Sequence, residues 1–193
     1  MGPLAVDLRK TYVYRDYLGW DDGERWELID GAPHNMTPAP SRRHQEMSGE
    51  LFRQFANYLS EKPCRVYAAP FDVRIPAGEE ADDDITTVVQ PDISIVCDRS
   101  KLDDLGCRGA PDLIVEILSP ATAKKDMKYK FNRYERAGVR EYWLVDPMAN
   151  TVMVFTLTAD GRYGRPEIYA EEEQVRVGIF EDMTVELRSV FRE

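Results

Sequence analysis

Two short apolar runs, separated by a segment long enough for a helix, constrain the fold more than any other feature of the sequence. Residues 113–118 form a continuous apolar run with one charge in it, and residues 141–145 form a second run. Such runs are typical of strands that are buried on both faces of a sheet. Ser119 or Thr122 can cap a helix between them, and Gly138 can end that helix. Strand, helix and strand in this order predict two parallel strands joined by a right-handed crossover.

The residues before this unit predict a hairpin and a first long helix. Residues 26–29 and 32–36 flank Asp30-Gly31, a dipeptide that favours a two-residue turn between paired strands. Ser41 can cap a helix that extends to about Glu61. The residues of one helix face recur there at spacings of three and four: His44, Met47, Leu51, Phe55 and Tyr58.

Further extended segments complete a mixed sheet. Residues 64–75 are predicted to be extended with a bend at Pro70, and residues 88–96 to form a strand interrupted by Pro91. From Thr151 onward, alternating polarity and turn residues predict antiparallel hairpins. We therefore expect one α/β (α+β) domain over residues 1–193, with helices flanking a mixed β-sheet and residues 1–14 as an N-terminal extension.

Length, apolar content and cysteine use exclude several classes of protein. No apolar run approaches the roughly 18 residues that a membrane helix needs. The segment from Met1 to Leu4 has no basic part followed by an apolar one, so no secretory signal is expected. Cys64, Cys97 and Cys107 are odd in number and widely spaced, and we interpret them as reduced thiols of a soluble cytoplasmic protein.

Charge is unevenly distributed along the chain. The formal net charge is −10, whereas proteins that bind nucleic acid usually carry a basic surface. Residues 79–84 form an acidic run, which we expect to be exposed, mobile and remote from any bound phosphate. Arg42 and Arg43 form a small basic group. A longer basic stretch follows later in the chain: Lys124, Lys125, Lys128, Lys130, Arg133, Arg136 and Arg140. Because a ligand in a cleft responds to the local field, the net charge does not exclude a nucleic-acid substrate.

Two carboxylates lie in or beside apolar strand segments, where a lone charge is costly. Glu116 lies within the run 113–118, and Asp92 directly precedes the apolar residues 93–96. Buried carboxylates are usually paired, hydrogen-bonded or bound to a metal. On neighbouring strands they could hold one Mg²⁺, which prefers oxygen ligands and would polarise a phosphate and activate a water. A nearby lysine would stabilise the developing charge. The alternative is a structural pair that caps backbone groups or binds an arginine.

Five segments form a specific combination: Glu27-Leu28-Ile29-Asp30-Gly31, Pro38-Ala39-Pro40-Ser41 leading to His44, Gln90-Pro91-Asp92, residues 111–120 and residues 138–147. This combination resembles the Uma-two family, a group of bacterial proteins in the restriction-endonuclease-like superfamily. The resemblance covers roughly residues 15–190. It implies a mixed sheet flanked by helices, with two acidic metal ligands and a lysine.

The sequence departs from the superfamily pattern at the lysine. Side chains alternate along a strand, so the lysine is expected two residues after Glu116, where this chain has Leu118. A lysine of the following helix would have to replace it. At about 100° per residue, the predicted inward stripe of that helix is Met127, Phe131 and Tyr134. Lys130 lies beside this stripe and is where the resemblance places the helical lysine. Lys124 is the geometrical alternative, whereas Lys125 is predicted to point away.

Other candidate residues have both a functional and a structural interpretation. Glu27 is either a third acidic metal ligand or an ordinary exposed strand residue. His44 is either a core or boundary histidine or a contact to phosphate or metal. Arg43 and Lys124 are candidates for binding the phosphates of a substrate.

Two further aspartates are interpreted as structural. Asp112 follows Pro111 and imitates the proline-aspartate signature of the superfamily, but Pro91-Asp92 is the better match. We therefore predict that Asp112 is a turn residue. Asp126 could pair with Lys130 four residues later, which would be a structural use of that lysine.

The combined hypothesis is an endonuclease that depends on Mg²⁺, for which Mn²⁺ can substitute. Asp92 and Glu116 would hold the metal, and Lys130 would assist. DNA is the expected substrate and a homodimer the expected assembly, because superfamily members commonly cut two strands with two sites; no membrane association is expected. The first alternative is a catalytically degenerate module that binds nucleic acid or protein, which Leu118 and the net charge favour. The second is an enzyme that acts on another phosphoester, such as a nucleotide.

Overall fold

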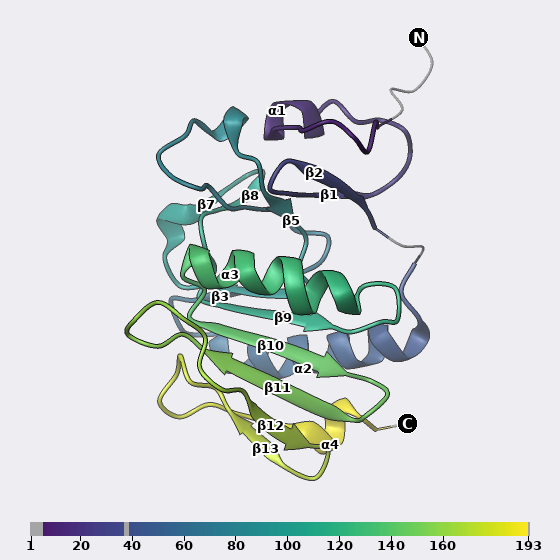
Figure 1. The fold of residues 1–193 in the computed structure, drawn as a ribbon. Helices are drawn as coiled ribbons and strands as arrows, with labels where there is room; N and C mark the ends of the chain where they lie inside the picture. The colour runs from purple at the N-terminus through teal and green to yellow at the C-terminus, as the bar shows by residue number, and fades with distance from the viewer. Residues whose placement is uncertain (1–5, 37–38, 193) are drawn as a thin grey trace.

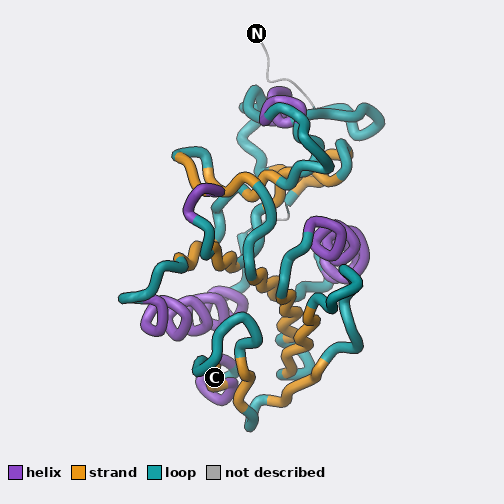
Figure 2. Tube along the Cα trace, turned by 90° about the vertical axis from the view of Figure 1, so that its left-hand side faces the viewer, coloured by secondary structure: helices purple, strands orange, loops and turns teal. Residues whose placement is uncertain are grey.

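The computed structural model describes residues 6–36 and 39–192, and it places one sheet between two helices (Figure 1). Six strands form this central sheet in the order β12-β11-β10-β9-β6-β3. Their bounds are Arg65–Ala68 (β3), Ile93–Val96 (β6), Leu113–Ile117 (β9), Glu141–Asp146 (β10), Thr151–Thr156 (β11) and Glu167–Ala170 (β12). Helix α3 (Phe131–Ala137) covers one face and α2 (Arg42–Leu59) the other, as the turned view in Figure 2 shows.

The parallel pair predicted from the sequence lies at the centre of this sheet. Strands β9 and β10 pair in parallel with Glu116 opposite Leu144, and all of β9 is buried. The connection between them contains a π-helical turn, η3 (Lys125–Lys130), which continues into α3. Gly138 ends α3 with a φ of 84°, which glycine adopts without strain. The strand-helix-strand prediction is confirmed, although the pattern did not reveal the π turn.

Helix α2 also forms as predicted. The Ser41 hydroxyl accepts a hydrogen bond from the backbone N–H of His44 at 3.2 Å and so caps the first turn. The buried residues of α2 are Met47, Leu51, Phe55 and Leu59. They pack on the sheet face that contains Ile95, Val115 and Trp143. Burial of this apolar stripe fixes the helix against the sheet.

A second six-stranded sheet was only partly expected. Its order is β2-β1-β5-β4-β8-β7, with the bounds Trp26–Ile29 (β1), Ala32–Asn35 (β2), Val73–Arg74 (β4), Val88–Val89 (β5), Leu102–Asp103 (β7) and Gly106–Arg108 (β8). The β1–β2 hairpin is confirmed, and Asp30 and Gly31 have the positive φ values, 49° and 79°, of a tight turn. Short helical turns accompany this sheet at Tyr14–Tyr17 (α1), Asp82–Asp84 (η1) and Arg99–Lys101 (η2).

Two prolines mark the points where the chain crosses between the sheets. Pro70 lies between β3 of the central sheet and β4 of the second, and Pro91 lies between β5 of the second and β6 of the central sheet. The Ala69–Pro70 peptide bond is cis. The bend predicted at Pro70 and the interruption predicted at Pro91 are therefore confirmed. Both crossings border the same cleft.

The C-terminal part consists of antiparallel hairpins, as predicted after Thr151. Strands β11 and β12 pair antiparallel at one edge of the central sheet. Strands β13 (Gln174–Arg176) and β14 (Thr184–Glu186) form a separate hairpin, which is followed by α4 (Leu187–Val190). Val175 and Val185 of this hairpin join the core under α2.

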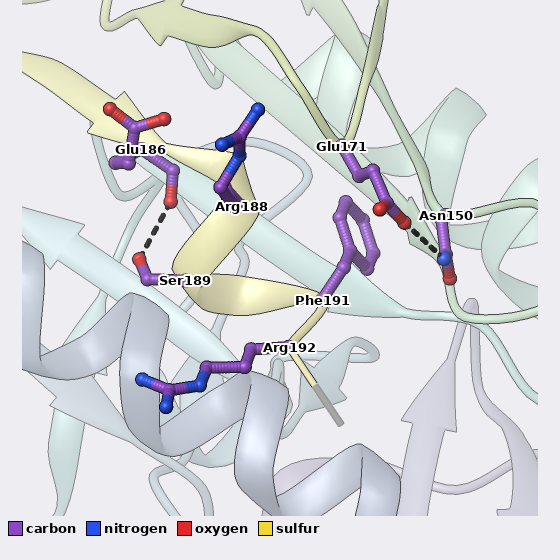
Figure 3. A pocket seen from close by; sticks show the side chains of 7 residues that line it. All are labelled: Asn150, Glu171, Glu186, Arg188, Ser189, Phe191 and Arg192. Atoms are coloured by element: carbon purple, nitrogen blue, oxygen red, sulfur yellow. Dashed lines mark hydrogen bonds between the residues drawn. The ribbon is translucent and has the colours of Figure 1, made fainter.

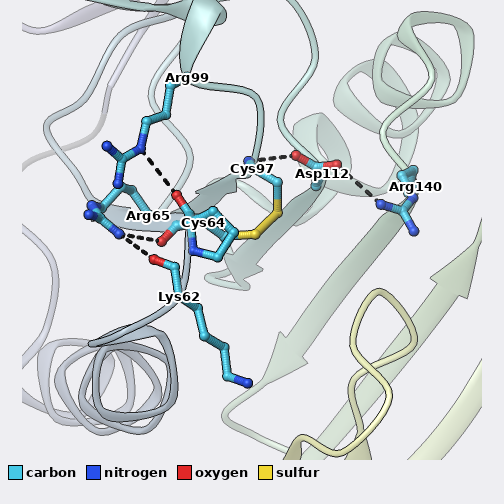
Figure 4. Close-up of a disulfide and its surroundings, with 8 residues drawn as sticks. Lys62, Cys64, Arg65, Cys97, Arg99, Asp112 and Arg140 are labelled. Atoms are coloured by element: carbon cyan, nitrogen blue, oxygen red, sulfur yellow. Dashed lines mark hydrogen bonds and ion pairs between the residues drawn. A yellow bond between two sulfur atoms is a disulfide. The ribbon is translucent and has the colours of Figure 1, made fainter.

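The interpretation of three reduced thiols is wrong for two of them. Cys64 and Cys97 form a disulfide, with Cα atoms 3.9 Å apart (Figure 4). Cys64 directly precedes β3 and Cys97 directly follows β6, so the β3–β6 ladder brings together two residues that are 33 positions apart. Cys107 is free and buried, and burial raises the pKa of its thiol to about 11. The cysteines therefore give no support for a cytoplasmic location.

The acidic run at residues 79–84 is largely exposed, and its recorded ion pairs connect it to the second sheet and α1. Asp82 pairs with Arg74 and Arg108, and Asp84 lies 2.8 Å from Arg15. None of these partners belongs to the basic stretch at residues 124–130. The ion pairs of this run are therefore made with the second sheet and α1 rather than with Lys124 to Lys130.

Two other expectations concern the chain ends and membranes. Pro38, which was expected to help break the chain before α2, and the segment from Met1 to Leu4 lie outside the described residues. Within residues 6–36 and 39–192, no helix is both long enough and apolar enough to cross a membrane.

Candidate active site

A cleft of about 710 Å³ lies between the start of α2, the turn η3 and the two crossings between the sheets. The start of α2, both proline crossings, the end of β9, the turn η3 and the turn after β10 all contribute to its walls. Five of the residues singled out in the sequence line it: Arg43, His44, Asp92, Glu116 and Lys130. Residues from four separate segments of the chain thus meet at one place.

Glu116 projects from the buried strand β9 into this cleft. It is 4% exposed, and its Oε1 accepts hydrogen bonds from Lys130 Nζ at 2.8 Å and from the Tyr134 hydroxyl at 2.9 Å. Burial raises the pKa of Glu116 to about 8, because desolvation and the nearby carboxylates of Asp126 and Asp92 together outweigh the Lys130 charge. A carboxylate in this setting gains by binding a further cation.

Asp92 lies beside Glu116 across the β6–β9 ladder. Ile93 pairs with Val115 in this antiparallel register, so the residues that flank the pair, Asp92 and Glu116, are neighbours. Asp92 Oδ2 accepts a hydrogen bond from the backbone N–H of Ile117 at 2.7 Å. Both carboxylates therefore face the same cleft, as the sequence predicted.

His44 contacts Asp92 from the first turn of α2. Its Nε2 lies 3.3 Å from Asp92 Oδ2. Burial lowers the pKa of His44, but the hydrogen bond and charge of Asp92 raise it more, so the net pKa is above the usual value. The structure places His44 at the cleft wall, as a boundary residue, and its Nδ1 is buried without a hydrogen-bond partner among the described residues.

Glu27 lies beneath the cleft rather than in its lining. Its Oε1 is 2.7 Å from Lys130 Nζ, and its Oε2 is 2.6 Å from Lys125 Nζ. It also accepts a hydrogen bond from the backbone N–H of Gln90 at 2.9 Å. The side chain is fully buried, which corrects the alternative of an exposed strand residue. Burial raises the pKa of Glu27, but the two lysines outweigh burial and hold it at about 2. Both of its oxygens are already engaged.

The π turn changes which residues of η3 face inward. Lys125, predicted to point away, lines the cleft and binds Glu27, whereas Met127, predicted to face inward, is 51% exposed. The prediction assumed about 100° per residue, which holds for an α-helix and not for the wider π turn. Residues five apart, such as Lys125 and Lys130, then share a face. Lys124 is exposed and is not part of the cleft lining.

Asp126 is a residue that the sequence assigned only to a structural pair. It lines the cleft, is 2% exposed, and lies 3.7 Å from Lys130 Nζ through its Oδ1. Within the described part of the chain, this Oδ1 is buried and has no hydrogen-bond partner. Burial raises the pKa of Asp126. The four-residue spacing to Lys130 was the sequence signal that pointed to it.

A second cavity, of about 680 Å³, lies between α4 and the strands β11 and β12, and it contains none of the predicted site residues. Figure 3 shows Asn150, Glu171 and the arginines 188 and 192 around it. Arg43 donates a hydrogen bond to Asn150 Oδ1 at 2.7 Å, which connects the walls of the two cavities.

Known proteins resemble this chain over most of its length. The crystal structure of a protein from Anabaena variabilis ATCC 29413, described as a putative nuclease belonging to DUF820, has a TM-score of 0.73 and 19% identity. The match covers 93% of this chain and 97% of that one, and at this identity it concerns the fold alone. An uncharacterized protein of Synechocystis sp. (strain ATCC 27184 / PCC 6803 / Kazusa) is 26% identical over 149 residues, 76% of this chain and 74% of that protein. The model of the Uma2 family, described as "Putative restriction endonuclease", matches residues 14–188. The chain therefore has a mixed α+β fold similar to that of the Anabaena protein, and it belongs to the Uma2 family.

Proposed function

We propose that this protein is a metal-dependent endonuclease that hydrolyses phosphodiester bonds of DNA. The observation that carries the proposal is the meeting of Asp92, Glu116 and Lys130 in one cleft, although they come from the crossing before β6, from β9 and from η3. Two carboxylates beside a buried ammonium group are suited to phosphodiester hydrolysis, because they can hold a metal and stabilise charge on a phosphate.

The donor set of the cleft fits Mg²⁺, with Mn²⁺ as a substitute. The recorded contacts of Asp92 and Glu116 go to Oδ2 and Oε1, which leaves one oxygen of each carboxylate for a metal. Within residues 6–36 and 39–192, no three His, Cys, Asp or Glu side chains form a group that could enclose a metal. A pair of carboxylates suits Mg²⁺, which keeps several waters and binds substrate phosphate as well. Glu27 is better suited to position the two lysines than to bind the metal.

Each side chain of the cleft has a separate task in this proposal. Asp92 and Glu116 would hold the metal, which supplies a polarised phosphate and an activated water. Lys130 would stabilise the charge that develops on the phosphate, because its ammonium is held at a fixed position by Glu27. Arg43 and His44 would contact neighbouring phosphates from the start of α2. Lys124, exposed at the start of η3, would contact the substrate outside the cleft.

A homodimer is part of the proposal, because two copies of the site could cut the two strands of DNA together. The observation that supports it is the edge position of β12, where Ile168 is 63% exposed. An apolar side chain on an unpaired strand edge favours association with a second copy. Light scattering or analytical ultracentrifugation of the protein measures the mass of the particle directly.

A second candidate function is a nuclease fold that binds nucleic acid or protein without cleaving it. Leu118 occupies the position at which the superfamily pattern places a lysine, and the net charge is −10. Such a module would bind Mn²⁺ poorly. A titration with Mn²⁺ therefore separates the two candidates before any cleavage is measured.

The test of the proposed function is the cleavage of supercoiled plasmid DNA with Mg²⁺ or Mn²⁺, and with EDTA as the metal-free condition. We expect cleavage that EDTA abolishes and that Glu116→Gln lowers by about two orders of magnitude or more. Glu141→Gln is the matched control, because Glu141 is also buried, in the next strand, and accepts hydrogen bonds from Trp143 and from the backbone at residues 178 and 179. Equal activity of the Glu116 variant and the control would contradict the assignment of the site.

A further inference from the structure

The ammonium group of Lys130 lies among three carboxylates, in the kind of position that a bound cation takes. Its Nζ is 2.7 Å from Glu27 Oε1, 2.8 Å from Glu116 Oε1 and 3.7 Å from Asp126 Oδ1. The lysine side chain is 3% exposed, so solvent contributes little to its neutralisation. Two of the three contacts are direct ion pairs, whereas the third, to Asp126, is about one ångström longer than either.

The longer contact leaves a buried acceptor without a donor. Asp126 is 2% exposed, and its Oδ1 has no hydrogen-bond partner within the described residues. An unmatched buried acceptor destabilises the folded protein, so its presence calls for an explanation. The only cation within 4 Å of this oxygen, in the part of the chain that the structure describes, is Lys130, four residues along the same helical turn.

The charges of the group do not balance. Four carboxylates, those of Glu27, Asp92, Glu116 and Asp126, face two ammonium groups, those of Lys125 and Lys130. With all six ionised, their charges sum to −2, and a protonated His44 beside Asp92 brings the sum to −1. The group therefore carries an excess of negative charge that a divalent cation can compensate. A divalent cation on Glu116 would, however, lie close to the Lys130 ammonium, and two such charges repel strongly in a poorly hydrated site.

We propose that Lys130 exchanges ion-pair partners when a divalent metal binds. In the metal-free protein it neutralises Glu116, and in the metal-bound protein it keeps its contact with Glu27 and moves its second contact to Asp126. Asp126 is then a positioning residue, and its unpartnered oxygen is the acceptor reserved for the lysine. This inference rests on the proposed function, because it requires that Asp92 and Glu116 bind a metal.

The exchange predicts that replacing Lys130 raises the affinity for metal instead of lowering it. A lysine that does not compete for the metal ligands should leave metal affinity nearly unchanged when removed. A lysine that competes for Glu116 should raise metal affinity when removed, because the metal no longer has to displace it. Tyr134 provides the matched control, since its hydroxyl donates to the same Glu116 Oε1 without carrying a charge.

The first experiment measures binding of Mn²⁺ alone by isothermal titration calorimetry, at fixed pH and without DNA. We expect Lys130→Met to bind Mn²⁺ at least about tenfold more tightly than the parent protein. Tyr134→Phe should stay within about twofold of the parent, because it removes a hydrogen bond but no charge. Lys130→Gln, which keeps a polar group, replaces Lys130→Met if the latter does not fold. Unchanged or weaker binding by the folded Lys130 variant would overturn the exchange.

The second experiment is a double-mutant cycle between positions 126 and 130, again with Mn²⁺ as the probe. In the parent background, Asp126→Asn should weaken Mn²⁺ binding about tenfold, because Lys130 loses its alternative partner. In the Lys130→Met background, the same substitution should have an effect below about threefold. Equal effects in both backgrounds would mean that Asp126 binds the metal or acts through its field alone, and the exchange would be wrong.

The outcomes also separate this inference from the proposed function. A parent protein that neither binds Mn²⁺ nor cleaves DNA contradicts both. A parent that binds Mn²⁺ and cleaves, together with a Lys130 variant whose Mn²⁺ affinity does not rise, contradicts the exchange and leaves the nuclease proposal standing.

Discussion

The same two residues, proline and aspartate, directly precede the strands β6 and β9, and the two pairs lie at opposite ends of one antiparallel ladder. Pro91-Asp92 precedes β6, and Pro111-Asp112 precedes β9. Each aspartate accepts a hydrogen bond from a backbone N–H at the end of the partner strand: Asp92 from Ile117 at 2.7 Å, and Asp112 from Cys97 at 2.8 Å. In both pairs the proline is buried and the aspartate half-buried. The local chemistry of the two corners is the same.

What surrounds the two corners differs. Beside Asp92 lie a second carboxylate, Glu116, and a buried lysine in an open cleft. Beside Asp112 lie Arg140, at 3.3 Å, and the Cys64–Cys97 disulfide (Figure 4). The first corner leaves negative charge in excess, whereas the second compensates its charge and is covalently closed. In both places the aspartate caps the end of the partner strand, and the neighbouring residues decide what else it can contact.

The largest effect is expected on cleavage. Asp92→Asn should lower metal-dependent cleavage of DNA by about two to three orders of magnitude, because it removes one of the two ligand charges. Asp112→Asn should leave the cleavage rate of the folded protein unchanged. Initial rates on supercoiled plasmid, measured for both variants at the same folded concentration, give the comparison. If both variants lost the same fraction of the cleavage rate, the two corners would not differ in function, and the assignment of Asp92 to the site would be contradicted.

The second effect concerns the disulfide of the Asp112 corner. Replacing both Cys64 and Cys97 by alanine should lower the free energy of unfolding by about 3 kcal/mol, since the bond closes a loop between residues 33 positions apart. Denaturant titration of the oxidised parent and of the double variant measures this difference. The cleavage rate at a temperature where both are folded should stay within about twofold. A large loss of cleavage would show that the two ends of the ladder are coupled.

The smallest effect is on the stability of the metal-free protein. Asp92→Asn should leave the free energy of unfolding level or slightly raised, because it relieves repulsion with Glu116 while the amide oxygen still accepts from Ile117. Asp112→Ala should lower it by about 1–2 kcal/mol, because the Cys97 N–H loses its acceptor. Thermal melts in EDTA measure both. Clear destabilisation by Asp92→Asn would identify Asp92 as a structural residue.

Local patterns predicted the elements whose signals lie within one segment. The three- and four-residue spacing from His44 to Leu51 located α2, and the continuous run at 113–118 located β9. The proline at 91 divided β5 from β6 as expected. The second sheet was missed in part, because β7 and β8 have only two and three residues, too few to show any period.

The sequence predicted which residues lie in the candidate site better than it predicted the contacts that their side chains make. Asp92, Glu116 and Lys130 were expected in one cleft and lie there, while their chemical roles stay predictions. The orientation of Lys125 was wrong, because a π turn cannot be recognised from the spacing of apolar residues. The burial of Glu27 was also missed, since it depends on lysines 98 positions away in the chain and further.

The disulfide is a further contact between residues far apart in the chain that local sequence patterns did not predict. Spacing alone suggested no partner for Cys64, because its partner is 33 residues away and is brought close only by the β3–β6 pairing. An odd count of cysteines favoured reduced thiols. The structure instead pairs two and buries the third, Cys107.

The crossing at Gln90, Pro91 and Asp92 has a consequence for how this chain tolerates changes in length. The backbone N–H of Gln90 is anchored on Glu27 in one sheet, and the carboxylate of Asp92 is anchored on Ile117 in the other. A single residue joins the two anchors, so one insertion or deletion here would turn the aspartate to the opposite side of its strand. The connection at residues 157–166, between β11 and β12, carries no such pair of anchors to the cleft. When distant relatives are aligned, gaps are therefore expected in the connection at residues 157–166 and not in the crossing at residues 90–92.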